Sequence, residues 1–324
     1  MSTRKVAVKD RESQDHAADA ALVPARITVN KAYKMYVNGA FIRSESGRYL
    51  QVSSSEAGIG ADPATINVPW GSRKDIRDAV LAAKGAESKW AGKTAYNRGQ
   101  ILYRLAEMTE ARGAELREVL ERSGLSSQDA AAEVESTVDR IVYYAGMSDK
   151  LSALLASHNP VSGPHFAFTL PEPTGVIGVL SPPVPALLGL VSAFLPVIVG
   201  GNTAVVVVPA SPDTAAGQAD PRVALVFAEC LATSDMPGGV VNLITGPPAE
   251  LGPILAKHRE VNGLFAWSED EKLGAELGTL AADSVKRVKW VRDRLEERVA
   301  TEGQGLGLIE PFLEHKSIWH PVGL

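Results

Sequence analysis

Cysteine is nearly missing from this sequence, because Cys230 is the only one among 324 residues. A single cysteine excludes an internal disulfide and fits a reducing compartment. The six histidines are scattered along the chain, and none stands beside a Cys, Asp or Glu at the spacing of metal ligands. We therefore predict no metal site.

Excess positive charge and long apolar runs are missing as well. The formal net charge is -5, whereas a nucleic-acid partner favours a basic surface, so no such partner is expected. The longest apolar stretch, Leu187 to Val199, is too short to cross a membrane and contains Pro196. Residues 1–23 are charged and lack the apolar centre of a secretory signal. These absences favour a soluble, cytoplasmic protein.

The first half of the sequence predicts a leader, a hairpin and three helices. Residues 1–30 are polar and rich in alanine without a sustained period, which is typical of a flexible leader. Between Lys34 and Ile42, the pair Asn38-Gly39 suits the positive φ angles of a type I′ turn. Ser72 can cap a first helix, and two more helices are expected from about residues 97 and 127. Residues 160–173 form an extended connector.

Strands and helices alternate from Val176 onward. Strands are predicted at residues 176–180, 204–208, 240–244, 263–266 and 285–291, with helices at 187–199, 221–232, 250–258 and 271–282 between them. The alternation and the β-branched strands indicate an α/β fold with a Rossmann-like, doubly wound parallel sheet. One further strand is expected near residues 312–322. The glycines at 303–307 have no strand–helix context, so a flexible connector is expected there.

Several motifs together resemble the cofactor-binding domain of the aldehyde dehydrogenase superfamily. The motifs are Tyr36-Val-Asn-Gly39, Glu172 to Val179, Gly201-Asn-Thr203, Pro237 to Gly246 and Val285 to Val288. The strongest resemblance is to the degenerate second unit of the tandem-domain aldehyde dehydrogenases, which also lacks the catalytic cysteine. It implies a cofactor-binding domain at residues 31–291 and an oligomerisation strand at 312–324. Residues 292–311 would form a short connector where the family has its catalytic domain.

The resemblance implies that the positions which carry the family's chemistry are vacated. Val184 stands where the family has a side-chain amide that stabilises the oxyanion, and Val291 stands where it has a glutamate base. Cys230 lies upstream on the apolar face of a predicted helix, which is typical of a buried core residue and not of a nucleophile. Three chemical roles are therefore empty, and no catalytic residue is predicted.

The resemblance also places a vestigial cofactor site at Ser181, Pro182, Pro209, Gly246 and Ser268. Trp267 replaces a glycine that lets the backbone approach the pyrophosphate, and Glu269 adds negative charge beside it. Ser268 fits a helix cap equally well, and Gly246 fits an ordinary turn. We expect no cofactor, or NAD bound only weakly.

The parts that the resemblance assigns to subunit contacts are retained. These candidate oligomerisation residues are Tyr36, Val37, Phe41, Phe312, Ile318 and Trp319. A terminal strand with exposed aromatic side chains needs a sheet to dock on, which a neighbouring subunit can provide. We therefore predict a non-catalytic subunit that assembles with a full-length aldehyde dehydrogenase or with itself. The alternatives are an NAD(P)-dependent oxidoreductase that acts on aldehydes only within a complex, and an NAD(H)-binding sensor.

Overall fold

The computed structural model describes residues 31–53, 65–210, 220–292, 299 and 302–323. Contacts divide the chain into a unit of residues 1–31 and a compact unit of residues 32–324. The predicted leader, residues 1–30, lies outside the described residues, and everything below concerns the second unit.

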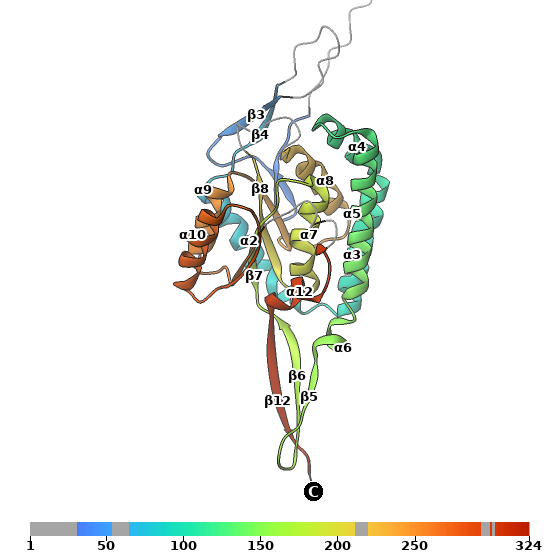
Figure 1. Ribbon diagram of the computed structural model, residues 1–324, viewed down its shortest axis with the longest axis vertical. Coiled ribbons are helices and arrows are strands. Elements are labelled where there is room, and N and C mark those ends of the chain that lie inside the picture. The colour runs from blue at the N-terminus through green and yellow to red at the C-terminus, as the bar shows by residue number, and fades with distance from the viewer. Residues whose placement is uncertain (1–30, 54–64, 211–219, 293–298, 300–301, 324) are drawn as a thin grey trace, which may run out of the picture. The chain divides into compact units, whose positions relative to one another are not determined.

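The centre of this unit is a seven-stranded sheet with the strand order β11-β10-β7-β8-β9-β1-β2 (Figure 1). Its strands are β1 (Met35–Val37), β2 (Ala40–Ile42), β7 (Val176–Leu180), β8 (Thr203–Pro209), β9 (Val241–Gly246), β10 (Gly263–Trp267) and β11 (Arg287–Val291). Strands β7 to β11 are mutually parallel, and the hairpin β1–β2 adds antiparallel to β9. The doubly wound α/β fold predicted from the sequence is confirmed.

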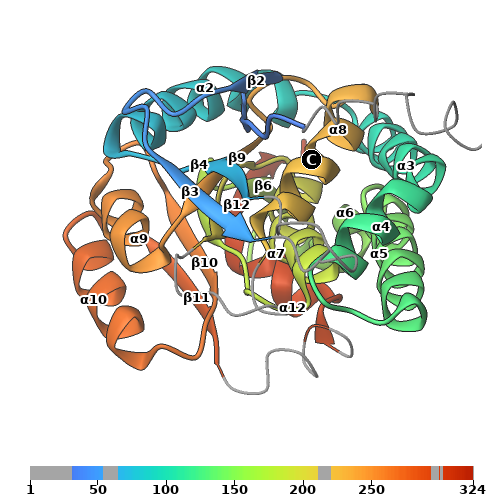
Figure 2. The same ribbon diagram turned by 90° about the horizontal axis from the view of Figure 1, so that it is seen from above.

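Helices cover both faces of this sheet (Figure 2). On one face, α7 (Ala186–Val199) and α8 (Pro221–Thr233) pack directly on the strands. Helices α3 (Ala95–Ala111), α4 (Gly113–Arg122) and α5 (Ser127–Met147) pack on those two helices and complete the same core. The other face packs against α2 (Arg73–Ala91), α9 (Pro248–Lys257) and α10 (Glu271–Ala282). Alternate residues of one strand point to opposite faces, so Val206 joins the first core and Val207 joins the second. Burial on both faces explains why β8 consists almost wholly of valine.

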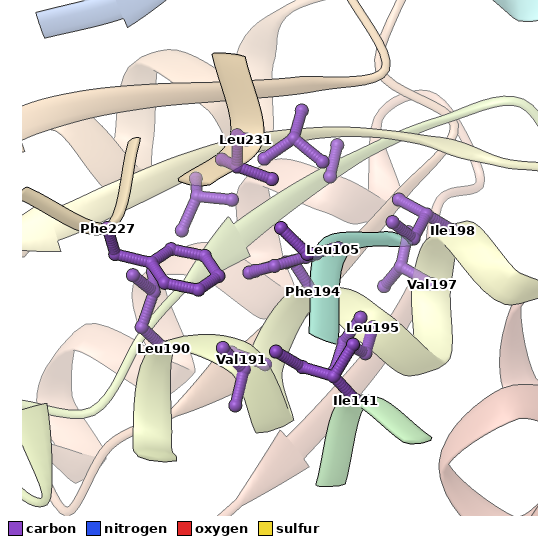
Figure 3. Close-up of a cluster of buried hydrophobic side chains, with 14 of the residues drawn as sticks. Leu105, Ile141, Leu190, Val191, Phe194, Leu195, Val197, Ile198, Phe227 and Leu231 are labelled. Carbon is purple, nitrogen blue, oxygen red and sulfur yellow. The ribbon is translucent and has the colours of Figure 1, made fainter. Parts of the chain in front are cut away.

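Helix α7 forms the centre of the larger core, as its largely apolar sequence predicts. All its residues from Leu187 to Val199 are buried, and Figure 3 shows their contacts with α3, α5 and α8. The rings of Phe194 and Phe227 lie 6.2 Å apart. The indole of Trp90 donates a hydrogen bond of 2.9 Å to the carbonyl oxygen of Ile198. The buried hydroxyl of Ser192 on α7 donates to the Leu188 carbonyl oxygen at 2.6 Å and accepts from the Arg140 guanidinium at 2.5 Å.

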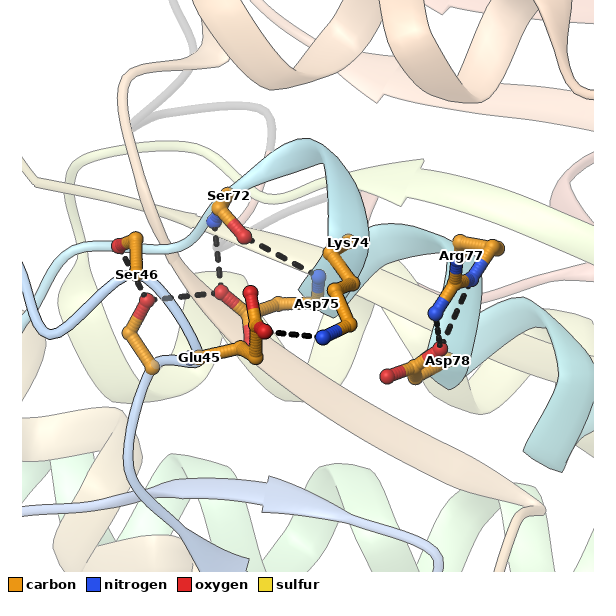
Figure 4. Close-up of polar contacts among 8 residues, drawn as sticks. Glu45, Ser46, Ser72, Lys74, Asp75, Arg77 and Asp78 are labelled. Carbon is orange, nitrogen blue, oxygen red and sulfur yellow. Dashed lines mark hydrogen bonds and ion pairs between the residues drawn. The ribbon is translucent and has the colours of Figure 1, made fainter.

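Helix α2 begins at the cap that the sequence predicts. The hydroxyl of Ser72 accepts from the backbone N–H of Asp75, and the Asp75 carboxylate accepts from the N–H of Ser72, which completes a capping box (Figure 4). The same carboxylate accepts bonds from the Ser44 hydroxyl at 2.8 Å and the Glu45 N–H at 3.0 Å. Asp75 thus joins the helix start to the segment that follows the hairpin.

The hairpin turn has the predicted geometry, with φ of 53° at Asn38 and 77° at Gly39. It packs tightly on the turn before β9. A Cβ atom at Gly238 would lie 2.7 Å from the carbonyl oxygen of Asn38. The Asn38 N–H also donates to the side chain of Asn242 at 3.0 Å. Close approach of two turns therefore accounts for glycine in the Pro-Gly-Gly motif.

Two smaller sheets complete the fold. One pairs β3 (Tyr49–Ser53) with β4 (Thr65–Pro69). The other has the order β12-β6-β5 and consists of β5 (Ser157–Asn159), β6 (His165–Pro173) and β12 (Leu313–Pro321). β12 runs antiparallel to β6 from Leu313↔Pro173 to Pro321↔His165. Helix α6 (Leu151–Leu155) packs against β6, and Figure 1 shows this sheet extending away from the other helices.

The structure departs from the sequence-based expectations at several points. Helix α4 was not predicted, and β11 begins at Arg287 because Val285 has a positive φ of 53° in a turn. The part of residues 292–311 that is described is packed rather than flexible. Gly303 accepts a bond from the Tyr144 hydroxyl at 3.1 Å, and α12 (Leu306–Ile309) and the short 3-10 helix η1 (Glu310–Phe312) follow with Ile309 buried.

Candidate functional site

The carboxyl ends of the parallel strands define the place where an open α/β sheet binds ligands. The chain passes from β7 to β8 and β9 on one side, and it then continues on the other side of β7 with β10 and β11. The strand order therefore reverses between β7 and β10, and such a switch point opens a crevice beyond the strand ends. Ser181 follows β7 and Ser268 follows β10, so the structure places both predicted site residues at this point.

The elbow after β7 is held by packing and hydrogen bonds. Ser181 is buried, and both its N–H and its hydroxyl lie within hydrogen-bonding distance of the Val207 carbonyl oxygen, at 3.2 and 3.3 Å. Pro182 lies against α7 so closely that a Cβ atom at Gly189 would approach its Cγ to 2.6 Å. Val184 is half-buried just before the helix. These contacts give Ser181 and Pro182 a structural role in joining strand to helix.

The N-terminus of α7 already holds an anion from this chain. The carboxylate of Glu133, which is buried on α5, accepts hydrogen bonds from the backbone N–H groups of Leu187 at 2.7 Å and Leu188 at 3.1 Å. Helix N-termini attract anions because their first N–H groups have no partner within the helix. Glu133 was missed from the sequence, where it is one of several acidic residues on a helix and nothing marks it as buried.

Strand β10 ends at an aromatic residue, Trp267, whose side chain is buried in the larger core. Trp267 is 1% exposed, and its ring centroid lies 5.8 Å from that of Phe265. The Trp267 indole N–H is enclosed without a hydrogen-bond partner among the described residues. The indole is part of the larger core and cannot swing away without opening it.

The start of α10 carries its own negative charge. Asp270 is the N-cap and accepts from the N–H of Leu273 at 3.0 Å. Ser268 does not cap the helix, which corrects one of the two roles expected for it, because its hydroxyl accepts from the N–H of Asp270 at 3.2 Å instead. Glu269 and Glu271 are exposed beside this cap. Three adjacent carboxylates repel a pyrophosphate, so this helix start does not fit one.

The remaining predicted cofactor residues are also tied into the fold. Pro209 and Gly246 are directly opposite each other in the β8–β9 ladder. A Cβ atom at Gly246 would lie 2.7 Å from the Leu251 side chain, so close packing requires the glycine there. Val291 is 6% exposed at the end of β11. The five candidate cofactor residues thus gather at one edge of the sheet, but each has a packing or hydrogen-bonding role.

Cys230 does not have the surroundings of a reactive cysteine. It is fully buried on α8, and burial raises the pKa of its thiol to about 12. A thiol that stays protonated at neutral pH is a poor nucleophile. Within the described ranges, no group of three His, Cys, Asp or Glu side chains could hold a metal ion. No helix of the same residues is long and apolar enough to cross a membrane.

The candidate oligomerisation residues divide into buried and exposed ones. Tyr36 and Val37 are 2% and 6% exposed, because β1 lies inside the seven-stranded sheet. Phe312 is fully buried, and its ring lies 5.5 Å from that of Phe265. The expectation that Phe312 is exposed is therefore wrong, since its side chain anchors the chain end in the core. Phe41 and Trp319 are 37% and 60% exposed, and Ile318 is half-buried.

The fold and the arrangement of strand ends define an α/β protein built like a dinucleotide-binding domain. The model of the aldehyde dehydrogenase family matches residues 60–290. Hydroxyisobutyraldehyde dehydrogenase of Mycolicibacterium austroafricanum is 32% identical over 258 residues, which cover 78% of this chain and 47% of that protein. Alpha-ketoglutaric semialdehyde dehydrogenase of Bacillus subtilis is 30% identical over 261 residues, covering 79% and 50%. This chain therefore belongs to the aldehyde dehydrogenase family.

Solved structures agree with this assignment. The NAD-dependent aldehyde dehydrogenase of Sinorhizobium meliloti superimposes with a TM-score of 0.70 at 26% identity, covering 81% of this chain and 50% of that one. An NAD⁺ complex of the Bacillus cereus aldehyde dehydrogenase shares the fold with a TM-score of 0.69 at 24% identity, covering 81% and 51%. The chain thus spans about half the length of the relatives it matches.

Proposed function

We propose that this chain is a non-catalytic member of the aldehyde dehydrogenase family that assembles with an active aldehyde dehydrogenase or with its own copies. One observation carries the proposal: the family's sheet is kept, while its strand ends are closed by the chain's own side chains. Trp267 ends β10 with its indole buried in the larger core, and Glu133 and Asp270 accept bonds from N–H groups at the starts of α7 and α10. The groups that would bind a phosphate are therefore already engaged.

The vacated chemical positions support the same proposal. Aldehyde oxidation through a covalent intermediate needs a thiolate, an oxyanion donor and a base. Val184 and Val291 supply neither a donor nor a base, and the Cys230 thiol is buried with a raised pKa. What remains is a stable framework together with a sheet, β12-β6-β5, that carries exposed aromatic residues.

Co-purification tests this proposal directly. The full chain is mixed with a full-length aldehyde dehydrogenase from the same genome, and complexes are separated by size exclusion and by pull-down. We expect either a mixed complex or a self-assembled species, and no reduction of NAD⁺ or NADP⁺ by the chain alone with a panel of aldehydes. A strictly monomeric chain that captures no such partner, or one that oxidises aldehydes by itself, contradicts the proposal.

An NAD(H) sensor is the second candidate, and the observation in its favour is the likeness to a solved NAD⁺ complex across most of the chain. Calorimetry with NAD⁺ and NADH separates the two. If no heat of binding is measured at millimolar cofactor, the NAD(H)-sensor candidate is excluded. Micromolar affinity, which corresponds to about 8 kcal/mol, requires specific contacts and would replace the first proposal.

A further inference from the structure

The outer edge of β12 is an open sheet edge. β12 has nine residues, and β6 pairs with only one of its two edges. No other strand among the described residues covers the second edge. An exposed strand edge offers a row of backbone N–H and C=O groups to an added strand.

The same sheet exposes apolar side chains near that edge. Phe166, Leu170 and Trp319 are 47%, 36% and 60% exposed. Directly opposite residues of β6 and β12 share a face, so Phe166, Phe168, Leu170 and Ile318 lie on one face together with Lys316 and His320, whereas Trp319 lies on the other. The ring centroids of Phe166 and Phe168 are 5.5 Å apart. Exposed apolar side chains beside an open edge mark an interaction surface.

We infer that β12 pairs antiparallel with β12 of a second copy of this chain, about a two-fold axis through Ser317 and perpendicular to the sheet. This inference rests on the proposed function and names one partner and one surface for it. The resulting sheet would be continuous across both copies. The faces that carry Phe166 and Leu170 would then lie on the same side in both copies, because this axis keeps each residue on its own face.

The charges of β12 select this register. With the axis at Ser317, the whole strand is paired, Glu314 lies opposite His320 of the other copy, and Lys316 lies opposite Ile318. Shifting the axis to residue 316 sets two lysines against each other, and shifting it to residue 318 leaves Glu314 without a partner in the opposite β12. Like charges directly opposite destabilise an antiparallel pair, whereas a carboxylate opposite an imidazole donor stabilises it. The sequence of β12 is thus self-complementary about its centre.

Cysteine scanning tests the register, and the chain suits it because its only thiol is buried. Ser317→Cys brings two thiols together across the axis, so mild oxidation should give a disulfide-linked dimer, which needs Cα atoms within about 7 Å. Val322→Cys is the matched control. It is 51% exposed next to the same strand, but its two copies would lie roughly 30 Å apart. Equal cross-linking of the two variants, or none at Ser317→Cys, overturns the register.

Charge reversal provides a second, non-covalent test by sedimentation equilibrium of the full chain. His320→Glu sets two glutamates opposite each other twice in the dimer, so its dissociation constant should rise about 10-fold. Adding Glu314→Lys restores opposite charges and should return the constant to within about 3-fold of the wild type. If the dissociation constants of both variants equal that of the wild type, the dimer does not form through this edge of β12.

Pull-down with the full-length aldehyde dehydrogenase separates failure of this inference from failure of the proposed function. A chain that remains monomeric alone but captures the enzyme overturns β12 self-pairing and leaves the proposed function standing. A chain that does neither overturns both. Thermal melting of each variant confirms that the substituted chains are folded.

Discussion

Cys230 lies on α8 with its side chain fully enclosed, near the hydroxyl of Thr109 and the guanidinium of Arg112. Burial dominates over the nearby positive charge, and it raises the pKa of the thiol to about 12 from an ordinary value near 9.0. The folded state therefore keeps a proton that the unfolded state loses above pH 9. This difference in proton binding links the stability of the protein to pH.

The linkage gives a prediction with a defined sign. Because the folded pKa is the higher one, the stabilisation is fully present below pH 9 and is lost as pH rises toward 12. The free energy of unfolding of the wild type should thus fall more steeply over this range than that of Cys230→Ala, which lacks the group. Urea unfolding at a series of alkaline pH values measures both. Parallel curves for the two proteins would show that the thiol titrates normally.

Trp267 gives a second prediction at the same scale. Its side chain is 1% exposed, yet its indole N–H has no partner among the described residues. Trp267→Ala should cost about 3–5 kcal/mol because it leaves a large cavity. Trp267→Phe should cost no more than about 2 kcal/mol, since loss of volume is partly offset by removal of a buried unpartnered donor. Chemical unfolding of both variants checks the order, and an equal cost would show that the N–H is satisfied by water.

Among the elements, α7 depends on a residue from another helix. Its first N–H groups have no cap from their own segment, because Pro185 is the N-cap residue and makes no side-chain hydrogen bond. Glu133 of α5 supplies the acceptor for Leu187 and Leu188. The cap therefore also fixes α5 against α7, two helices that form much of the larger core.

Substitution of Glu133 should show this dependence. Glu133→Ala leaves two buried N–H groups without an acceptor and should cost roughly 3 kcal/mol. Glu133→Gln keeps a side-chain oxygen at the same reach and should cost only about 1 kcal/mol, the electrostatic part of the interaction with the helix. Denaturant unfolding measures both free energies. If the two variants are equally stable, the carboxylate does not act as the cap of α7.

The elements show what a single sequence can and cannot predict. The parallel strands, the buried α7 and the cap at Ser72 follow from residue patterns within one segment, and these predictions were confirmed. Glu133 and Phe312 depend on contacts between segments distant in the chain, so no local pattern marks one as a cap and the other as buried. The candidate cofactor residues lie at the carboxyl ends of the strands, and their packing partners come from other segments, which no local pattern reveals.

In the whole molecule, the segment at the start of β12 is fixed to the central sheet. The Phe312 ring packs on Phe265 of β10, and the Phe312 carbonyl oxygen accepts bonds from the Asn202 side chain at 2.9 Å and the Thr174 N–H at 3.3 Å. Arg287 of β11 bonds to the carbonyl oxygen of Leu313 and to the Glu314 carboxylate. β12 therefore starts from a fixed base, which limits the directions in which its free edge can point.

One substitution at Phe312, just before β12, and one at Trp319, within β12, should distinguish an effect on folding from an effect on assembly. Phe312→Ala removes a fully buried ring and should lower the free energy of unfolding by about 3–5 kcal/mol. Trp319→Ala removes a side chain that is 60% exposed, so stability should change by less than about 0.5 kcal/mol. In the β12 pairing proposed above, however, Trp319 faces His315 of the other copy, so this second variant should weaken self-association while its melting temperature stays unchanged. Thermal melting and sedimentation of both variants measure the two effects. If Trp319→Ala assembles as well as the wild type, the exposed indole contributes nothing to subunit contacts.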